Sequence, residues 1–312
     1  MRTRYSGAAI LVAASMLAAL RVSAQEPSRG LKLQIDTERP SYFLGEPVYL
    51  AARLVNQGPD ELRFMTLLNP KDGYLTISIR DPAGRGVGFV PLSSRDRDTP
   101  PATLAPKAEI GATFPVSFGA SGWVFQIAGR FVAQARFEVR TGPGEPLVIR
   151  SNPLEIAIRD EPGGARFPME GPEGLEAGRF LTWRGGDQLE RGLARLSQFA
   201  ERYPTSPVVD HYRVALGRSF SRPFKNYQKG SVRPADYARA LAELGRARDE
   251  VLPSSVRVEK YLAQATSFLG TDRGADAAES LRRARALIAE RVELADFREQ
   301  LERLEWAAGQ KQ

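Results

Sequence analysis

Hydrophobic residues alternate with polar ones in a series of short segments between residues 31 and 159. In each segment the apolar side chains occupy every second position, which is the period of a β-strand with one buried and one solvated face. The positions that share a face are Leu31, Leu33 and Ile35; Val48, Leu50, Ala52 and Leu54; Leu75, Ile77 and Ile79; Phe131, Ala133, Ala135, Phe137 and Val139; and Leu154, Ile156 and Ile158. Residues 62–67 and 109–118 add two further predicted strands.

Turn signals separate these strands, and no helical segment intervenes. Gly and Pro mark turns at residues 44–47, 56–59, 81–84 and 142–144. Because parallel strands need long crossover connections, we expect the sheets to be mainly antiparallel. About seven strands in about 130 residues is typical of an immunoglobulin-like sandwich.

The apolar period changes to that of helices after residue 187. Six runs carry their apolar residues at helical spacing, and most connections between them are short. The runs are Leu189, Leu193, Leu196, Phe199 and Tyr203; His211, Tyr212 and Leu216, begun by Ser206 and Pro207; Tyr237, Leu241, Leu244 and Val251; Val258, Tyr261, Leu262, Ala265 and Leu269; Leu281, Ala284, Leu287 and Ile288; and Leu294, Phe297, Leu301 and Leu304. They predict three antiparallel helix pairs.

Residues 160–186 lie between the two patterns and contain seven Gly and three Pro. That density disfavours a long regular element, although a short helix can form near residues 175–183. The fold prediction is therefore multidomain: an all-β sandwich over residues 25–160, a Gly/Pro-rich linker over residues 161–186, and an all-α helical-hairpin domain over residues 187–312.

The first 24 residues have the three parts of a secretory signal peptide. Arg2 and Arg4 precede a 14-residue uncharged run, residues 7–20, and small residues end the segment at Ala24. The run is shorter than the roughly 20 residues of a membrane span, so a retained anchor is the alternative. The prediction is an exported protein, periplasmic or extracellular. A second uncharged run, residues 110–129, alternates and contains Pro115, so it predicts two strands and a turn.

Four segments of the strand-rich part resemble the immunoglobulin-like domains of exported bacterial proteins. They are residues 42–48 (YFLGEPV), 54–56 (LVN), 128–131 (AGRF) and 151–154 (SNPL). The resemblance implies a fold and does not imply an activity, because such modules bind proteins or glycans or act as spacers.

The helical part resembles tetratricopeptide repeats, most clearly in FAERYPTSP at residues 199–207. Pro204 and Tyr212 recur, at the same spacing, as Pro253 and Tyr261. However, 49 residues separate the two prolines, where the family spacing is about 34. A plain helical bundle is therefore the alternative.

Composition excludes several kinds of site. The chain has no Cys and one His, which rules out disulfides, thiolate chemistry and zinc sites that need two His. Phosphate-binding glycine loops and nucleophile-elbow motifs are also missing, so the sequence predicts no cofactor, no metal and no catalytic residue. Lys and Arg exceed Asp and Glu by 44 to 37, but Arg2, Arg4 and Arg21 belong to the predicted signal peptide.

One stretch between Asp210 and Asp236 contains cations and aromatic residues but no acid. Such a mixture can hold an anionic chain, because cations neutralise charge and aromatic faces stack on rings. The alternative is a solvated insertion between helices. The candidate anionic-ligand residues are Arg213, Arg218, Phe220, Arg222, Phe224, Lys225, Tyr227, Lys229 and Arg233.

Two other features are better explained as structural. His211 has no neighbouring Ser or carboxylate in the spacing of a catalytic triad, so we interpret it as a structural histidine. Asp96 and Asp98 are offset by Arg95 and Arg97, so a solvated loop is favoured over a calcium site.

The sequence therefore predicts a non-enzymatic exported binding or scaffolding protein. Its expected partner is a protein or an anionic envelope polymer rather than nucleic acid, and the oligomeric state stays open. The alternative is a carboxylate-dependent enzyme acting on cell-wall glycan or another polymer, with the sandwich as its accessory domain.

Overall fold

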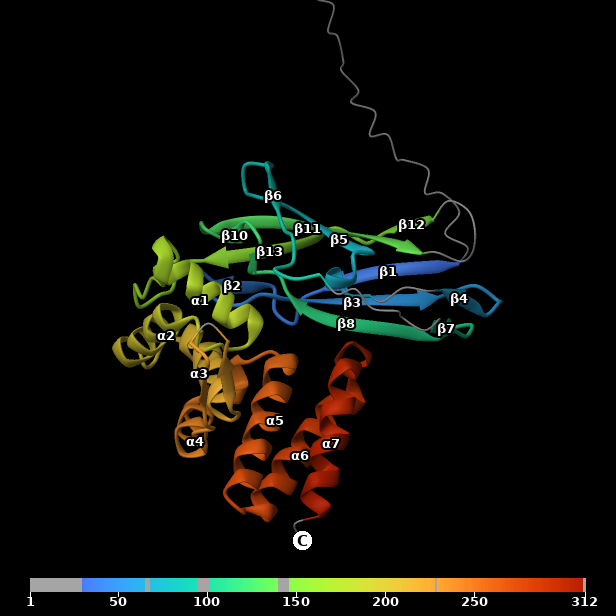
Figure 1. Cartoon of the computed structure of the whole chain (residues 1–312). Helices are drawn as coiled ribbons and strands as arrows, with labels where there is room; N and C mark the ends of the chain where they lie inside the picture. Colours follow the sequence, from blue (N-terminus) through green and yellow to red (C-terminus); the bar gives the residue numbers. More distant parts are fainter. Residues whose placement is uncertain (1–29, 65–67, 95–101, 140–145, 228, 311–312) are drawn as a thin grey trace, which may run out of the picture.

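The computed structural model describes residues 30–64, 68–94, 102–139, 146–227 and 229–310. A part built of strands precedes a part built mainly of helices, as the sequence predicted. In Figure 1 the strands form two layers at the top, and the helices lie below them. The predicted signal peptide, the end of the strand predicted at 62–67, the turn at 142–144 and residues 95–98 lie outside the described residues.

The two layers are a three-stranded sheet and a six-stranded sheet, which together form a β-sandwich-like fold. The smaller sheet has the order β1-β3-β8, and the larger has the order β2-β13-β11-β5-β6, with β12 also paired to β11. All ladders are antiparallel except that of β2 with β13. The strands are β1 (Leu31–Asp36), β3 (Tyr49–Asn56), β8 (Glu109–Pro115), β2 (Ser41–Phe43), β13 (Leu154–Arg159), β11 (Gly129–Val139), β5 (Leu75–Arg80), β6 (Gly86–Gly88) and β12 (Leu147–Arg150).

Three short elements complete this part. The hairpin of β9 (Phe118–Gly119) and β10 (Gly122–Trp123) follows β8, so the uncharged run at 110–129 forms strands and a turn as predicted. β4 (Leu62–Phe64) pairs with β7 (Ala102–Leu104), and η1 (Pro70–Asp72) precedes β5.

The alternating positions identified in the sequence form the interior of the sandwich. Leu33 pairs with Leu54, and Leu54 pairs with Ile110 on its other side. In the second sheet Ala133 lies between Ile79 and Leu154. Because alternate residues point to opposite faces, each sheet turns its apolar set toward the other sheet.

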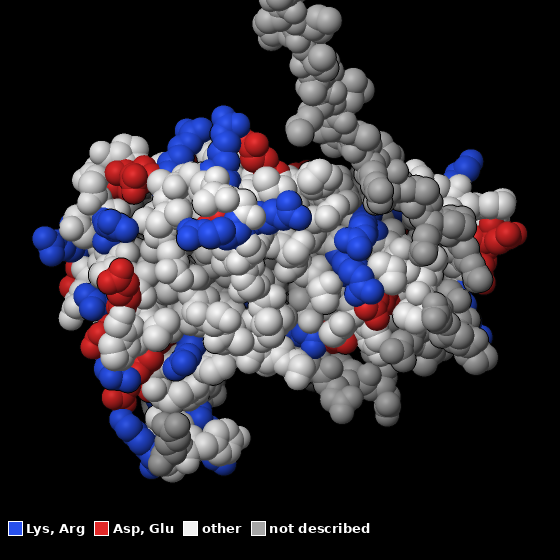
Figure 2. Space-filling view, turned by 90° about the horizontal axis from the view of Figure 1, so that it is seen from above, with Lys and Arg blue, Asp and Glu red and all other residues white. Residues whose placement is uncertain are grey.

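The outer face of the larger sheet is polar and rich in arginine. Figure 2 looks onto this side of the molecule, where blue side chains outnumber red ones. Arg130 pairs with Glu155 across two strands, and Arg136 pairs with Glu138. The other exposed arginines on these strands are Arg80, Arg150 and Arg159.

Seven α-helices, two short 3-10 helices and a small hairpin make up the C-terminal part of the described chain. Their bounds are α1 (Gly171–Trp183), α2 (Glu190–Arg202), α3 (Pro207–Phe220), β14 (Phe224–Asn226), β15 (Ser231–Arg233), α4 (Tyr237–Arg246), η2 (Asp249–Val251), α5 (Ser254–Gly270), α6 (Gly274–Glu290), η3 (Val292–Phe297) and α7 (Arg298–Gly309). The six predicted helices correspond to α2 through α7. The most extensive helix contacts are α1 with α2, α3 with α4 and α5 with α6. The predicted hairpins paired α2 with α3, α4 with α5 and α6 with α7. Because α1 is an additional helix that pairs with α2, each observed pair is shifted by one helix from the prediction.

The segment between the two patterns packs against both parts. Phe167 is fully buried, and its ring meets Trp123 of the sandwich and Tyr212 of α3. One continuous apolar core runs from the strands through Phe167 and α1 into α2 and α3, while α5, α6 and α7 enclose a second core. The strand part and the helices are thus joined by buried side chains.

A second junction lies at the edge of the smaller sheet. η3 packs against β8, and a Cβ added at Gly111 would lie 2.9 Å from the Glu293 backbone. The 3-10 helix η3 therefore covers the edge strand β8. Among the described helices, none combines the length and the apolar character needed to cross a membrane.

Candidate functional site

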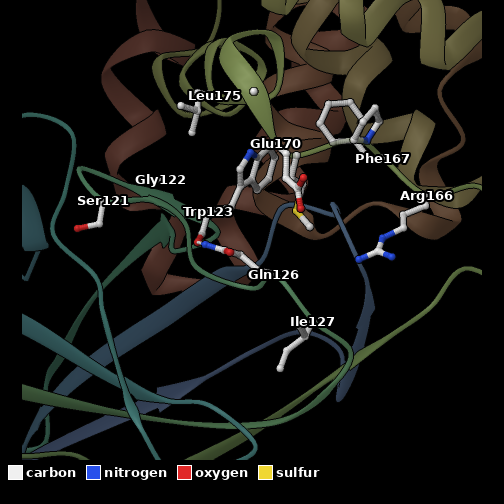
Figure 3. A pocket seen from close by; sticks show the side chains of 12 residues that line it. Ser121, Gly122, Trp123, Gln126, Ile127, Arg166, Phe167, Glu170 and Leu175 are labelled. Atoms are coloured by element: carbon white, nitrogen blue, oxygen red, sulfur yellow. Dashed lines mark hydrogen bonds between the residues drawn. The ribbon is translucent and has the colours of Figure 1, made fainter.

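A cavity of about 680 Å³ opens where the sandwich meets the first helix. Its walls come from two segments far apart in the sequence, one around the β9–β10 hairpin and one leading into α1 (Figure 3). The lining residues are Ser121, Gly122, Trp123, Gln126, Ile127, Arg166, Phe167, Pro168, Met169, Glu170, Gly171 and Leu175. This volume is within the range of known ligand pockets, about 300–1,000 Å³.

Trp123 fixes the back wall of this junction cavity. Its indole is buried, packs edge-on against Phe118 at 5.4 Å between centroids, and donates a 3.1 Å hydrogen bond to the carbonyl of Gly174. The buried N–H thus has an acceptor, as a tryptophan inside a protein requires. The bond ties the hairpin to the first turn of α1.

Two glycines allow close packing of α1, Gly174 against the segment that leads into the helix and Gly178 against the sandwich. A Cβ at Gly174 would lie 2.3 Å from the Met169 carbonyl, and one at Gly178 would lie 2.1 Å from the Phe118 ring. No side chain larger than hydrogen fits at such distances. Part of the Gly content of residues 161–186 therefore serves tight packing.

The opening of the cavity combines charged and apolar groups. Ile127 and Leu175 expose 49% and 39% of their surface, so apolar side chains face the solvent here. Arg166 and Glu170, from the segment leading into α1, and Gln126, from the segment after the β9–β10 hairpin, lie around the cavity (Figure 3). Gln126 donates a 2.8 Å hydrogen bond to the Trp123 carbonyl, which orients its amide.

Arg166 and Glu170 are both exposed, and neither forms an ion pair with another described residue. A cation, a carboxylate and an amide around an apolar surface match the groups of an extended polypeptide. Its main chain and charged side chains can bond to the polar groups, while an apolar side chain covers Ile127 and Leu175.

The predicted anionic-ligand residues occupy two different surroundings. On α3, Arg213 donates to the carbonyls of Arg246 and Pro204, and Arg218 is buried against Glu259. The others lie at the end of α3 and on the β14–β15 hairpin: Phe220, Arg222, Phe224, Lys225, Tyr227, Lys229 and Arg233.

Several of these hairpin cations already have partners. Lys229 pairs with Glu190, and the Arg233 Nε lies 2.7 Å from an oxygen of Asp187. The Lys225 ammonium stands 4.8 Å from the centre of the Tyr227 ring. Arg222 instead donates to the carbonyl of Arg184, a residue outside the predicted set. Binding of an anionic ligand to the nine residues stays a prediction.

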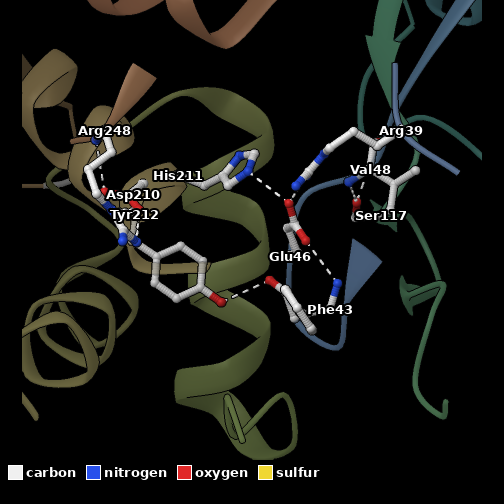
Figure 4. A network of polar contacts seen from close by, with 10 residues as sticks. Arg39, Phe43, Glu46, Val48, Ser117, Asp210, His211, Tyr212 and Arg248 are labelled. Carbon is white, nitrogen blue, oxygen red and sulfur yellow. Dashed lines mark hydrogen bonds and ion pairs between the residues drawn. The ribbon is translucent and has the colours of Figure 1, made fainter. Parts of the chain in front are cut away.

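His211 belongs to a buried polar network between the sandwich and α3 (Figure 4). Its Nε2 lies 3.0 Å from an oxygen of Glu46, which also pairs with Arg39 and accepts a 2.8 Å hydrogen bond from the Phe43 amide. Burial acts to raise the pKa of Glu46, but the His211 hydrogen bond and the charges of His211 and Arg39 outweigh it, so the pKa is lowered. Beside this network, Tyr212 donates a 2.8 Å hydrogen bond to the Gly45 carbonyl.

The described residues contain no cluster of three or more His, Asp or Glu side chains that can hold a metal ion. Only Ser93 and Ser94 of the 93–98 loop are within that described set.

No protein family and no curated protein matches this sequence. Among solved structures, the chain is similar to the CARDB domain of a Pyrococcus furiosus protein, with 12% identity over 42% of this chain and 94% of that chain, at a TM-score of 0.23. It is also similar to the sporulation control protein Spo0M of Bacillus subtilis, with 12% identity over 49% of this chain and 54% of that chain, at a TM-score of 0.24. The C-terminal domain of wzt matches with 13% identity over 42% of this chain and 74% of that chain, at a TM-score of 0.25. At such scores these likenesses carry no argument about function.

Proposed function

We propose that the chain is a non-enzymatic, exported binding protein that holds a segment of another polypeptide in the junction cavity. In this proposal residues 1–24 are a signal peptide, the strand-rich part is an immunoglobulin-like sandwich, and the helix pairs are a tetratricopeptide-like array. The two-layer, mainly antiparallel sheets support the second assignment, and the successive helix contacts support the third.

The observation that carries the proposal is the combination of groups at the cavity mouth. Two exposed apolar side chains, Ile127 and Leu175, stand beside Arg166 and Glu170, two charges of opposite sign with no ion-pair partner among the described residues. Trp123 and the tight packing of α1 hold the walls in place without a ligand. A preformed cavity of this kind lowers the ordering cost of binding.

The test starts from a displayed library of random peptides selected on the purified protein. Calorimetry with a selected peptide should give an affinity that Ile127→Glu weakens at least about tenfold, because the new carboxylate faces the bound apolar side chain. The matched control is Val132→Glu, which also replaces a β-branched apolar residue by glutamate, at a position that exposes 40% of its surface on the outer sheet face.

Two outcomes would overturn the proposal. One is a set of selected peptides whose affinities do not respond to Ile127→Glu. The other is an absence of binding peptides together with turnover of a cell-wall polysaccharide by the purified protein, which would favour the enzymatic alternative.

A further inference from the structure

Three arginines surround a single buried carboxylate at the junction of α1, α3 and α5. Arg184 places its Nη2 2.8 Å from one oxygen of Glu259, and Arg218 contacts the other oxygen. Arg222 donates a 2.8 Å hydrogen bond from its Nη2 to the main-chain carbonyl of Arg184. The group therefore combines α1, the end of α3 and α5 in one arginine cluster, defined as Arg184, Arg218, Arg222 and Glu259.

The arginine cluster carries more positive than negative charge. Among the described residues, Glu259 is the carboxylate that pairs with arginines of the cluster. Asp187 pairs instead with Arg233, outside the cluster. Three guanidinium groups and one carboxylate leave a net charge of about +2. Partial desolvation of its guanidinium, followed by the neighbouring charge of Arg184, lowers the pKa of Arg222. This is the electrostatic situation that an added anion would relieve.

The members lie at different depths. Arg218 exposes 13% of its side chain and Glu259 exposes 6%, so this pair is the base of the cluster. Burial lowers the pKa of Arg218 to about 10. The Arg184 side chain is 40% exposed, and Arg222 is exposed at the surface. The outer two side chains are thus partly exposed to solvent.

The backbone of Arg184 is held in an unusual conformation. It ends α1 with φ 67° and ψ 45°, the left-handed region that glycine fills at lower cost. The hydrogen bond from Arg222 to its carbonyl helps to fix it there. A residue with a side chain is therefore kept where glycine fits better, and its guanidinium reaches Glu259.

We propose that Arg184 and Arg222 form the surface of a binding site for a tetrahedral oxyanion, the phosphate or sulfate group of a ligand, with the Arg218–Glu259 pair as its base. Planar guanidinium groups present paired N–H donors that match such oxygens. This site takes Arg222 from the predicted basic segment, adds Arg184, and does not depend on the junction cavity or on the proposed function.

The test measures the binding of inorganic phosphate to the purified protein by calorimetry, at constant ionic strength with chloride as the replaced anion. Arg222→Gln should weaken binding at least about tenfold, since it removes charge-assisted hydrogen bonds. Arg184→Gly should weaken it similarly while preserving the left-handed backbone, so this variant keeps the test informative if Arg222→Gln fails to fold. Arg246→Gln, at an exposed arginine of α4, is the matched control.

A second arm distinguishes the source of the phosphate. Flotation with phosphatidylglycerol-containing vesicles is compared with flotation with phosphatidylcholine vesicles. Binding of inorganic phosphate without vesicle binding assigns a soluble ligand; vesicle binding that phosphate displaces and both variants abolish assigns a lipid headgroup. Three outcomes would overturn the site. They are an absence of binding in both arms, an affinity of Arg184→Gly equal to that of the unmodified protein, and a loss of affinity in Arg246→Gln equal to that in Arg222→Gln.

Discussion

The carboxylate of Glu38, in the sandwich, accepts hydrogen bonds of 2.8 and 2.7 Å from the backbone amide of Ser254, the first residue of α5. The two residues are 216 positions apart. The first amides of a helix have no partner within the helix, and a negative charge there also complements the helix dipole. Glu38 therefore caps a helix of the other part of the molecule.

Glu38→Ala should lower the free energy of unfolding by about 1 kcal/mol, the usual effect of losing an N-terminal cap. Part of the loss comes from Arg291, which also contacts Glu38, at 3.3 Å. Urea denaturation of the two proteins measures the difference. Glu61→Ala, at an exposed acid of the sandwich, is the control and should leave the unfolding midpoint unchanged. Equal midpoints for both variants would contradict the role of Glu38.

Gly178→Ala should destabilise the protein by about 2 kcal/mol. The added methyl group would lie 2.1 Å from the Phe118 ring, so either α1 or the β9–β10 hairpin must move. Gly245→Ala serves as the matched helical control, since no atom beyond its chain neighbours and the backbone of its own helix lies within 4 Å of its added Cβ. That control should be neutral or stabilising by up to about 1 kcal/mol, because alanine favours helix. Thermal unfolding compares the two, and equal effects would refute the packing argument.

Glu46 should make the free energy of unfolding depend on pH, and the direction follows from its lowered pKa. Its pKa is lowered in the folded protein from its usual 4.5, so the ionised form stabilises the fold above that value. The contribution is lost as the pH falls through the folded pKa. At pH 7, Glu46→Gln should cost about 3 kcal/mol, since it leaves His211 and Arg39 without their buried partner.

Urea denaturation of the unmodified protein and of Glu46→Gln between pH 7 and pH 3 checks this dependence. The gap in unfolding free energy between the two proteins should narrow below about pH 4.5. A gap that stays constant down to pH 3 would show that ionised Glu46 does not contribute in this way.

Local periodicity was sufficient to predict the longer strands and α2 through α7, but it did not predict the short strands β2, β6, β12, β14 and β15 or the full length of α1. The alternation at Leu31, Leu33 and Ile35, for example, became β1, and the helical spacing from Val258 to Leu269 lies within α5. Such patterns indicate which face of a strand or helix is buried, because they depend only on residues close together in the sequence. They carry no information about which distant element covers that face.

The junction cavity shows where this information ends. Residues 121–127 and 166–175 become neighbours only through the packing of α1 on the hairpin. In the sequence, Gly174 and Gly178 resemble helix-breaking residues of a linker. In the structure Gly174 lets α1 pack against the Met169 carbonyl just before it, and Gly178 permits close contact between α1 and the Phe118 ring of the sandwich. Trp123 carried the one local signal, since a lone tryptophan in a strand-rich segment needs a partner for its N–H.

The acid-free basic stretch is a case in which the sequence suggested a site that the structure largely neutralises. Between Asp210 and Asp236 the sequence contains no acid, yet Asp187, Glu190 and Glu259 reach its cations in the folded chain. The sequence alone therefore suggested more unpaired positive charge in this segment than the folded chain has. Among the described cations of this segment, Arg222 and Lys225 are the two that form no ion pair with an acid: Arg222 donates to a main-chain carbonyl and Lys225 lies over the Tyr227 ring.

Asn152 offers a further prediction, because its side-chain amide acts as a short piece of strand. Its Oδ1 accepts from the Ile35 amide at 3.0 Å, and its Nδ2 donates to the Ile35 carbonyl at 3.0 Å. These bonds satisfy both main-chain groups of Ile35 on the side of β1 that faces away from β3. Asn152 precedes β13, so it also connects the smaller sheet to the larger one.

Asn152→Ala should lower the unfolding free energy by about 2 kcal/mol, since two partly buried backbone groups lose their partners. Asn152→Asp should cost at least as much although it is nearly isosteric, because a carboxylate cannot donate to the Ile35 carbonyl and its charge faces that oxygen. Denaturant titration gives both values, and hydrogen exchange at the Ile35 amide localises the effect to β1. Full stability of the Asp variant at pH 7 would contradict a donor role for the amide, and unchanged exchange at Ile35 in both variants would contradict the pairing itself.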